Sequence, residues 1–337
     1  MKSSNIGGQA VMEGIMMRNR DKYALAVRKP NQEIELIVED YKGFLERPAL
    51  MKIPILRGVI SFVDSLVVGM RCLMYSATFF EEEEEKEDLS SLTEEERASR
   101  EAKEKKQEKA LMTGTLLLSI VIALALFLVL PYFLANFLRT VTENEWLVSL
   151  LESVLRVVIL LVYMVLVSRM EDIQRTFMYH GAEHKCINCI EHGMELNVEN
   201  VLKSSRLHKR CGTSFLFYVV IVSAIFLMFI QVESHLLRII LRLLLVPVIA
   251  GVSYEIIRLA GRSDNAFVDL LSKPGLALQK LTTNEPDASQ AEVAIKAVEA
   301  VFDWRTWLKE NYGIECPADP DRCETAEEQA GCREAEK

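Results

Sequence analysis

Long apolar runs dominate the pattern of this 337-residue chain, and they alternate with strongly charged stretches. Residues 111–138 and 146–168 are almost free of charge, whereas 81–109 consists mainly of Glu, Lys, Arg and small polar residues. A helix rises about 1.5 Å per residue, so about 20 apolar residues cross the hydrocarbon core of a bilayer. The pattern predicts four membrane spans, at 111–138 with Pro131 as a tolerable kink, 146–168, 215–231 and 236–259. The last two could also form a re-entrant hairpin, because the third is short and the fourth carries charges near its ends.

A further apolar helix is predicted at 54–80, where Arg57, Asp64 and Arg71 interrupt the pattern. These charges favour a helix that lies along the bilayer surface or packs on the bundle over a fifth span. Residues 22–40 show rough alternation around a Pro-Asn turn, which predicts a short β-hairpin. The fold class expected is therefore an all-α membrane bundle with a small α+β cytosolic portion.

The C-terminal third is predicted to begin with a connected loop formed by GRSDN (261–265) and KPGLALQKL (273–281). Asp287 and Gln290 resemble a capping box that opens a helix reaching about Phe302. The domain organisation expected is a unit at 1–80, a charged linker at 81–110, span pairs at 111–168 and 215–260 around a loop at 169–214, a helical segment at 261–303 and an acidic, disordered tail at 304–337.

Lys and Arg residues near the span ends predict the orientation. Six lie in 96–110, seven in 169–214 and three in 260–280, against only Arg139, Arg238 and Arg242 on the opposite side. This asymmetry predicts a multi-pass protein of the cell membrane with both termini in the cytoplasm. No signal peptide is expected, since the N-terminus lacks an early apolar core.

The seven cysteines then fall on the cytosolic side, where thiols stay reduced, so no disulfide framework is expected. The net charge of −9 comes largely from the linker and the tail and argues against a nucleic-acid-binding surface. The partners expected are membrane lipids and a substrate whose identity the sequence does not give. A homo-oligomer is also compatible with the pattern.

The densest cluster of reactive residues follows the second span, where His180, Glu183 and His184 spell H-x-x-E-H. On a helix these residues share one face, so two imidazoles can bind one divalent metal, Zn²⁺ above all, with the carboxylate placed to deprotonate a water. Glu255, near the cytosolic end of the fourth span, is the predicted third ligand, because an ionisable group there is paired or coordinated. The alternative is that Glu255 forms an ion pair with Arg258 or Arg262.

A rival site would use the thiols. Cys186, Cys189, His208 and Cys211 could make a four-ligand structural zinc site. This alternative requires the helix that carries His180 to end near residue 185, because in a continuous helix Cys186 and Cys189 point away from the two histidines. Two buried thiols without a ligand role are the simpler interpretation.

The loop before the third span is basic. Lys203, Arg206, Lys209 and Arg210 can anchor it to anionic headgroups. Alternatively, Arg206, His208 and Arg210 can bind an anionic substrate beside the metal and act in catalysis with Glu183. Near the N-terminus, Gly7-Gly8 permits a tight backbone path, and a glycine turn before a helix would place Gln9 and Glu13 one turn apart.

Five blocks together resemble a bacterial family of multi-pass membrane proteins, the YqhQ-like family of unknown function, whose members are described as predicted metal-dependent enzymes. The blocks are GGQAVMEGIMMR (7–18), YHGAEHK (179–185), VENVLKSSRLHKRCGTSF (198–215), GRSDN (261–265) and PGLALQKLTTNEPD (274–287). The resemblance covers about residues 5–303. It implies that His180, Glu183, His184, Arg206, His208, Cys211 and Glu255 are family positions, whereas Cys189 and the tail look particular to this chain.

The function predicted is a metal-dependent hydrolase at the cytoplasmic membrane face. In this hypothesis His180, His184 and Glu255 hold Zn²⁺, Glu183 is the general base, and Arg206, His208 or Arg210 steadies developing negative charge. The competing class is a non-enzymatic metal-binding scaffold or a transporter component. H-x-x-E-H proteases are soluble α/β enzymes, so the motif alone is shared with them.

Overall fold

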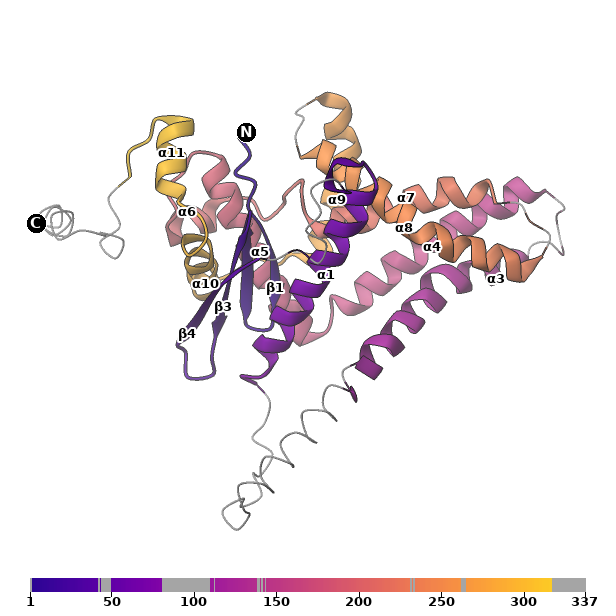
Figure 1. The fold of residues 1–337 in the computed structure, drawn as a ribbon, viewed down its shortest axis with the longest axis horizontal. Helices are drawn as coiled ribbons and strands as arrows, with labels where there is room; N and C mark the ends of the chain where they lie inside the picture. The colour runs from indigo at the N-terminus through magenta and orange to yellow at the C-terminus, as the bar shows by residue number, and fades with distance from the viewer. Residues whose placement is uncertain are drawn as a thin grey trace, which may run out of the picture.

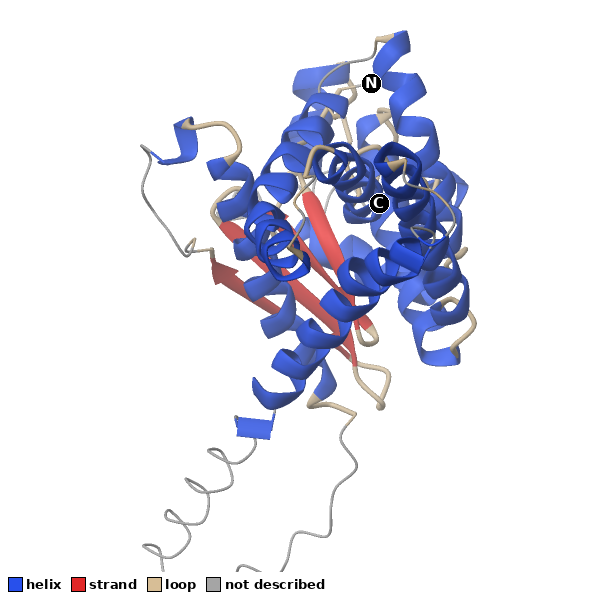
Figure 2. Cartoon of the chain, turned by 90° about the vertical axis from the view of Figure 1, so that its right-hand side faces the viewer, coloured by secondary structure: helices blue, strands red, loops and turns tan. Residues whose placement is uncertain are grey.

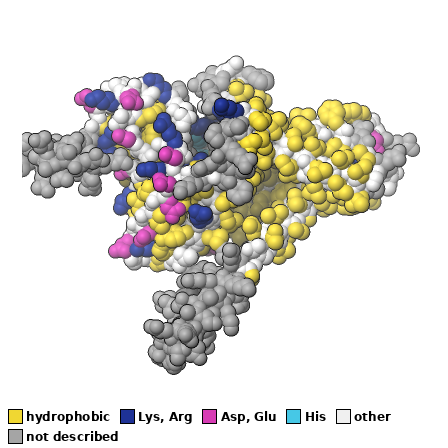
Figure 3. Space-filling view, in the orientation of Figure 1, with side chains coloured by type: hydrophobic (Ala, Val, Ile, Leu, Met, Phe, Trp, Pro, Cys, Tyr) yellow, Lys and Arg dark blue, Asp and Glu magenta, His cyan; other side chains and the backbone are white. Residues whose placement is uncertain are grey.

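The computed structural model describes residues 2–41, 43, 50–80, 110–111, 113–137, 140, 142, 144–230, 232, 234–261 and 265–316. Its described part is mostly helical and includes one small sheet near the N-terminus, which confirms the predicted fold class. A unit built around the sheet lies at one end, and an apolar bundle of helices extends away from it (Figure 1). Hydrophobic side chains cover the bundle, and charged side chains gather over the sheet unit (Figure 3).

The sheet is an antiparallel meander in the order β1-β2-β3-β4. Its strands are β1 (Gly7–Val11), β2 (Gly14–Asn19), β3 (Lys22–Arg28) and β4 (Ile34–Asp40). The hairpin predicted at 22–40 is confirmed by the pairing of β3 with β4. The β1–β2 hairpin was not predicted, and Gln9 and Glu13 do not share a helical face. Glu13 instead closes the two-residue turn between these strands with a positive φ of 49°.

Both faces of the sheet are buried, as the alternation of its side chains requires. Ile15, Met17 and Ala26 face the core shared with α5 (Glu171–Glu191) and α10 (Ala288–Glu299). Met16, Leu25 and Val27 face the opposite way and form a second core with Cys72 of α1 (Leu56–Ala77). Figure 2 shows the strands running between helices. Three layers result, with the sheet in the middle.

Four helices are long and apolar enough to cross a membrane, which indicates membrane association. They are α1, the helix Thr113–Phe137, α4 (Glu145–Val167) and the segment Leu236–Ala260 of α8 (His235–Ala260). The last three coincide with predicted spans. By contrast, α1 was predicted to lie on the bilayer surface or on the bundle. It is long and apolar enough to cross a membrane, although one of its faces packs on the sheet and another on α8.

The remaining predicted span, 215–231, corresponds to α7 (Gly212–Met228), which at 17 residues is shorter than the other four. It packs along α8 and α4 in the bundle (Figure 1). The ring of Phe229, directly after α7, lies 6.3 Å from the ring of Trp146 at the start of α4. Because these rings meet, the C-terminal end of α7 and the N-terminal end of α4 lie at the same end of the bundle.

Pro131 is accommodated by a change of helix type. A π-helical turn, η3 (Ala125–Val129), precedes α3 (Leu130–Phe137) within the first long apolar helix. Proline has no N–H to donate to the carbonyl four residues earlier. That carbonyl belongs to Phe127, and Nε of Arg156 donates to it at 3.1 Å.

A buried ionic cluster ties the two hairpins of the bundle together. Glu152 of α4 accepts a hydrogen bond from Arg156 at 2.7 Å, and two more from Arg242 of α8 at 2.7 and 2.8 Å. These side chains are at most 6% exposed. The Arg242 guanidinium also lies 4.6 Å from the centre of the Tyr132 ring. Glu152, Arg156 and Arg242 are therefore paired with one another, as a low-dielectric surrounding demands.

The C-terminal third differs from the prediction in two places. The predicted loop at 273–281 is instead part of a helix, α9 (Ala266–Thr282), which packs on α7. Gly275 allows this close packing, because a Cβ there would lie within 3.0 Å of the Ser214 side chain. Downstream, α10 begins with the predicted capping box of Asp287 and Gln290.

The expected disordered tail at 304–337 begins with an ordered helix, α11 (Trp304–Tyr312). Trp304 and Leu308 are buried in the core beneath α5 and α10, which explains why this segment folds. Residues 317–337 lie outside the described residues, as do 81–109 of the predicted linker and 262–264 of GRSDN. Two short elements, η1 (Leu50–Lys52) and α6 (Val198–Lys203), complete the described structure.

Replacing Glu152 by Gln should destabilise the protein by about 3 kcal/mol, because it leaves Arg156 and Arg242 buried without a counter-charge. The thermal unfolding midpoint of the detergent-purified protein measures this effect. Glu199→Gln is the matched control, since Glu199 pairs with Lys203 on an exposed surface and such pairs contribute little. Equal unfolding midpoints for the two variants would contradict the structural importance of the cluster.

Candidate metal centre

The site is built on the second half of α5, where every residue from 181 to 191 is buried. Apolar members of this stretch, such as Ile187 and Ile190, pack in the core against the sheet and α10. Its polar members are equally buried, and a buried polar group is costly unless it is hydrogen-bonded. The partners of these side chains therefore decide what lies over the polar face of α5.

The loop after α6 supplies those partners through its backbone. His184 Nδ1 is hydrogen-bonded to the carbonyl of Arg206 at 2.7 Å. Lys185 donates to the carbonyls of Leu202 and Ser204, and Asn188 donates to those of Ser205 and Leu207, all at 2.6–3.0 Å. Five carbonyls in six consecutive residues are thus held on one helix. This attachment fixes the path of the chain that leads to Cys211 at the start of α7.

Two imidazoles and one thiol converge at this point. The potential ligand atoms of His180, His184 and Cys211 all lie within 4.8 Å of one another. Cys211 Sγ is 3.3 Å from Nε2 of His180, and the centres of the two imidazole rings are 4.4 Å apart. Among the residues that the structure describes, His180, His184 and Cys211 form the group of at least three potential metal ligands, and we call it the His180–His184–Cys211 cluster.

Each histidine is oriented by a backbone carbonyl. His180 Nδ1 lies 2.8 Å from the carbonyl oxygen of Thr282, and His184 Nδ1 makes the corresponding contact with Arg206. A carbonyl only accepts, so each Nδ1 donates its N–H to one, which leaves the Nε2 of each ring as the nitrogen that can act as a metal ligand. This is the arrangement by which proteins commonly orient metal-binding histidines.

Cys211 occupies the N-cap position of α7, and its sulfur accepts a hydrogen bond from the Thr213 N–H at 3.3 Å. The N-terminus of a helix favours a negative charge, and the thiolate is the form of cysteine that binds metals. Two imidazoles and a thiolate suit Zn²⁺, and three protein ligands leave one position for water or substrate. The residues present therefore fit a catalytic type of zinc site.

Glu183 stands beside this cluster and faces β1. Its carboxylate is buried and accepts a hydrogen bond from the Gly8 N–H. Burial raises the pKa of Glu183, and the neighbouring His180 and the Gly8 N–H oppose this effect. Gly8 permits the approach, because a Cβ at this position would lie 3.1 Å from the Glu183 carboxyl carbon. His180, Glu183 and His184 thus lie on one continuous helix with the predicted spacing, and the Glu183 carboxyl group lies between α5 and β1.

The three other residues predicted to act in catalysis are held by neighbours. Arg206 donates to the Thr283 carbonyl at 2.7 Å. Arg210 donates to the Glu191 carboxylate and to the Ser3 hydroxyl. The backbone N–H and carbonyl of His208 both bond to the buried side chain of Gln279. The ring of His208 lies 5.7 Å from that of His184, which brings it next to the metal cluster.

Glu191 and His208 form a buried pair at the end of α5. Nε2 of His208 stands 3.5 Å from Oε2 of Glu191, a separation too long for a good hydrogen bond. Burial lowers the pKa of His208 to about 4, so its imidazole is neutral at physiological pH. Burial alone would raise the pKa of Glu191, but His208 and Arg210 hold it at about 2.

Glu255, the predicted third ligand, has a different environment. Its carboxylate accepts hydrogen bonds from Nε of Arg57 at 2.7 Å and from Nη2 of the same residue. Arg258 lies 4.0 Å away, as the ion-pair alternative expected, whereas Arg262 is outside the described residues. The structure thus places Cys211, and not Glu255, with His180 and His184. Arg57, on a separate helix far away in sequence, is what attracts Glu255.

The rival cysteine site does not form among the described residues, because α5 continues to Glu191 without a break. Cys186 is fully buried in the hydrophobic core, and burial raises the pKa of its thiol well above the usual value. Cys189 lies in the same core, donates to the Glu195 carbonyl at 3.3 Å and has a pKa raised by burial to about 11. Both thiols are structural.

The family model described as a protein of unknown function, DUF1385, matches residues 53–304. The chain belongs to this family. It is also similar to the uncharacterized protein YqhQ of Bacillus subtilis strain 168, with 34% identity over 292 residues, 86% of this chain and 90% of that protein. No solved structure matches the chain. These findings confirm the resemblance that the five sequence blocks indicated, and the DUF1385 match contains α5, the loop and Cys211.

Three residues that organise the site were not predicted in these roles: Glu191, Gln279, and Cys211, which was considered as a ligand only in the rival cysteine site. Cys211 could have been favoured by its place directly before Gly212 and a long apolar helix, a position where side chains cap helices. Glu191 lies on the predicted face of α5, one turn beyond Ile187. Gln279 carried no signal, because its role depends on α9 folding against the loop that contains His208.

Replacing Gly181 by Ala should destabilise the protein by about 1–3 kcal/mol, because a Cβ there would lie within 3.0 Å of the Asn284 carbonyl oxygen. The chain from Thr282 to Asn284 would be displaced, and with it the carbonyl that orients His180. Thermal unfolding measures the effect. Gly212→Ala is the control, since nothing lies within 4 Å of a Cβ at that position. An unchanged midpoint for Gly181→Ala would refute this packing argument.

Proposed function

We propose that this chain is a metal-dependent hydrolase of the cell membrane whose site lies at the cytoplasmic face. The observation that carries the proposal is the convergence of two Nε2 atoms and one sulfur, with both Nδ1 atoms already bonded to carbonyls. These donor atoms lie within 4.8 Å of one another, and the sulfur lies 3.3 Å from Nε2 of His180, so one ion can attract all three. Zn²⁺ is the metal that best suits this donor set.

In this proposal His180, His184 and Cys211 hold the metal. A zinc ion at such a position supplies a Lewis acid and lowers the pKa of a water at its open position. With a metal bound there, Glu183 would be the residue that takes up the proton of such a water and returns it to the leaving group. Its raised pKa suits this role, because a general base works best when its pKa lies near the working pH.

The surrounding residues keep these groups in place. Thr282 and Arg206 fix the imidazoles through their carbonyls, and Gly8 fixes the Glu183 carboxylate. His208, neutral and adjacent to His184, is a hydrogen-bonding group available on the side of the loop. Arg206 and Arg210 would stabilise the negative charge that develops on the substrate. Hydrogen bonds to the Thr283 carbonyl and to the Glu191 carboxylate hold these two side chains in position.

The orientation proposed has both termini and the sheet unit in the cytoplasm. The excess of Lys and Arg in 96–110, 169–214 and 260–280 supports it, as cytoplasmic flanks carry such an excess. The turns at the far end of the bundle, near Trp146 and Phe229, would then face the outside. In this orientation the metal centre lies where α7 enters the membrane.

Metal analysis of the detergent-purified protein is the first test. Wild type should carry about one equivalent of zinc, and His180→Ala/His184→Ala and Cys211→Ala should each lose most of it. Cys186→Ala is the matched control, because it removes a thiol of the same helix that packs only in the core. Retention of the metal by Cys211→Ala together with its loss from Cys186→Ala would overturn the assignment.

The second test separates an enzyme from a scaffold. Glu183→Gln should keep the metal but lower the turnover of a substrate found by screening esters, phosphoesters and peptides by at least about 100-fold. If the variant binds metal and supports cell growth and turnover as wild type does, Glu183 is not the base. Metal binding without any turnover by wild type would favour the scaffold or transporter component over the hydrolase.

A further inference from the structure

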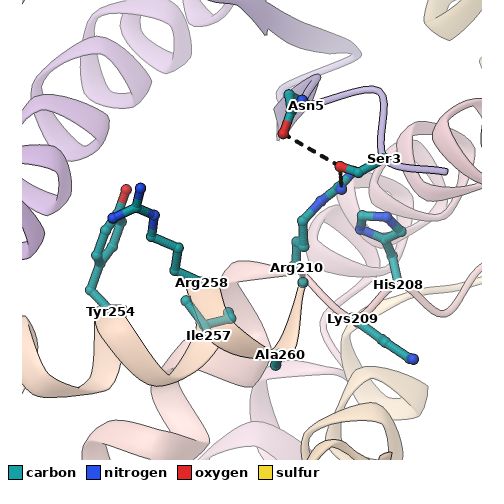
Figure 4. Close-up of a pocket in the computed structure, with 10 residues that line it drawn as sticks. Ser3, Asn5, His208, Lys209, Arg210, Tyr254, Ile257, Arg258 and Ala260 are labelled. Atoms are coloured by element: carbon teal, nitrogen blue, oxygen red, sulfur yellow. Dashed lines mark hydrogen bonds between the residues drawn. The ribbon is translucent and has the colours of Figure 1, made fainter. Parts of the chain in front are cut away.

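A cavity of about 490 Å³ opens beside the metal centre, where the last turns of α8 meet the N-terminal segment and the loop before α7 (Figure 4). The residues that determine its chemistry are His208, Lys209, Arg210, Tyr254, Ile257 and Arg258. Figure 4 shows Tyr254 and Arg258 on one side, with Arg210, Ser3 and His208 on the other. His208 belongs both to this wall and to the surroundings of His184.

The charged side chains that line the cavity, Lys209, Arg210 and Arg258, are all basic. The carboxylates that pair with them, Asp269, Glu191 and Glu255, belong to its surroundings and not to its lining. An occupant therefore meets the cationic side of three ion pairs. Such an arrangement attracts an anion and gives it several hydrogen-bond donors.

Arg258 has the greatest capacity to bind an additional group. Its nearest carboxylate, that of Glu255, is 4.0 Å away and already accepts two hydrogen bonds from Arg57. The Arg258 side chain is about one-third exposed, and its planar guanidinium can hold two oxygens of one anion. At 4.0 Å, Arg258 is beyond hydrogen-bond distance of this carboxylate, which is held by Arg57 instead.

Gly261 helps to shape the opposite wall. A Cβ at this position would lie within 3.0 Å of Cγ and Cδ of Arg210. The absence of a side chain therefore lets Arg210 lie across the end of α8 and reach Ser3 and Glu191. The end of the helix and the basic loop are thereby brought together around one space.

The location of the cavity limits what can fill it. Tyr254 and Ile257 belong to the last turns of an apolar helix long enough to span a membrane, so the cavity opens where the bilayer surface would lie. Tyrosine is enriched at this level of membrane proteins. Basic pockets at the ends of spans on the cytoplasmic side bind anionic lipid headgroups.

We infer that this cavity binds the phosphate group of an anionic phospholipid, with Arg258, Arg210 and Lys209 as the cationic groups around it. The inference deepens the proposed function, because it names the chemical class of the group held next to His208 and His184. One part of it rests on the proposed function, namely that the bound phosphate lies on the side of the metal from which the substrate enters. Binding itself requires none of the metal ligands.

Native mass spectrometry of the full-length protein in detergent tests the inference. The protein is titrated separately with phosphatidylglycerol, phosphatidylcholine and inorganic phosphate. Wild type should bind phosphatidylglycerol saturably and in preference to phosphatidylcholine. Arg258→Gln should raise the half-saturating concentration about tenfold or more, since a hydrogen bond to a charged group is lost. Arg169→Gln, an exposed arginine at the same end of the bundle outside the cavity lining, should bind as wild type does.

The outcomes separate the sources of phosphate. If inorganic phosphate binds saturably and Arg258→Gln weakens this binding, the cavity is a phosphate site that a soluble phosphate compound can also fill. Equal binding of both lipids, or equal binding by wild type and Arg258→Gln, overturns the inference. His180→Ala/His184→Ala, checked for folding by its unfolding midpoint, should keep the lipid. Unchanged turnover by this variant together with retained lipid binding would therefore defeat the proposed function and leave this inference standing.

Discussion

The structure depends on one constraint, which is the complete burial of a helix segment that is polar on one side. From residue 181 to 191 every residue of α5 is buried, yet the segment carries two carboxyl groups, a lysine, an asparagine and a histidine. Each must find a partner inside the protein. The carbonyls of 202–207 accept hydrogen bonds from the histidine, the lysine and the asparagine, and so the loop has one path across the helix. The two carboxyl groups accept instead from the Gly8 N–H and from Ser4 and Arg210. The position of Cys211 opposite His180 follows from that path.

The metal centre also joins the two parts of the molecule. Its histidines belong to α5, which packs on the sheet, whereas its thiol caps α7, which runs into the bundle. Thr282, which orients His180, ends α9, a helix packed on α7. The geometry of the cluster therefore depends on how the sheet unit sits against the membrane helices. Gly181 and Gly275 permit two close approaches in this junction.

Local patterns predicted the parts of this fold that local physics determines. Apolar length gave three spans, alternation gave the β3–β4 hairpin, and i, i+3, i+4 spacing placed His180, Glu183 and His184 on one face. Contacts between segments that are distant in sequence could not be predicted from these local patterns. Glu255 looked like a ligand because its partner, Arg57, lies on α1. The α9 segment looked like a loop because of its Pro-Gly pair, whereas the glycine is there because Ser214 leaves no room for a Cβ. The β1–β2 hairpin was missed since its turn uses Met12 and Glu13, which carry no turn signal.

The ionic cluster inside the bundle has a consequence for how the chain is made. The carboxylate that Arg242 contacts belongs to α4, in the first hairpin to leave the ribosome, whereas Arg242 itself belongs to the second. Glu152 and Arg156 can neutralise each other as soon as α4 forms. The guanidinium of Arg242 must wait for a partner that is already in the lipid. If the chain is inserted in sequence order, the carboxylate of Glu152 is in place before Arg242 arrives, and the earlier helices offer the later ones their counter-charge.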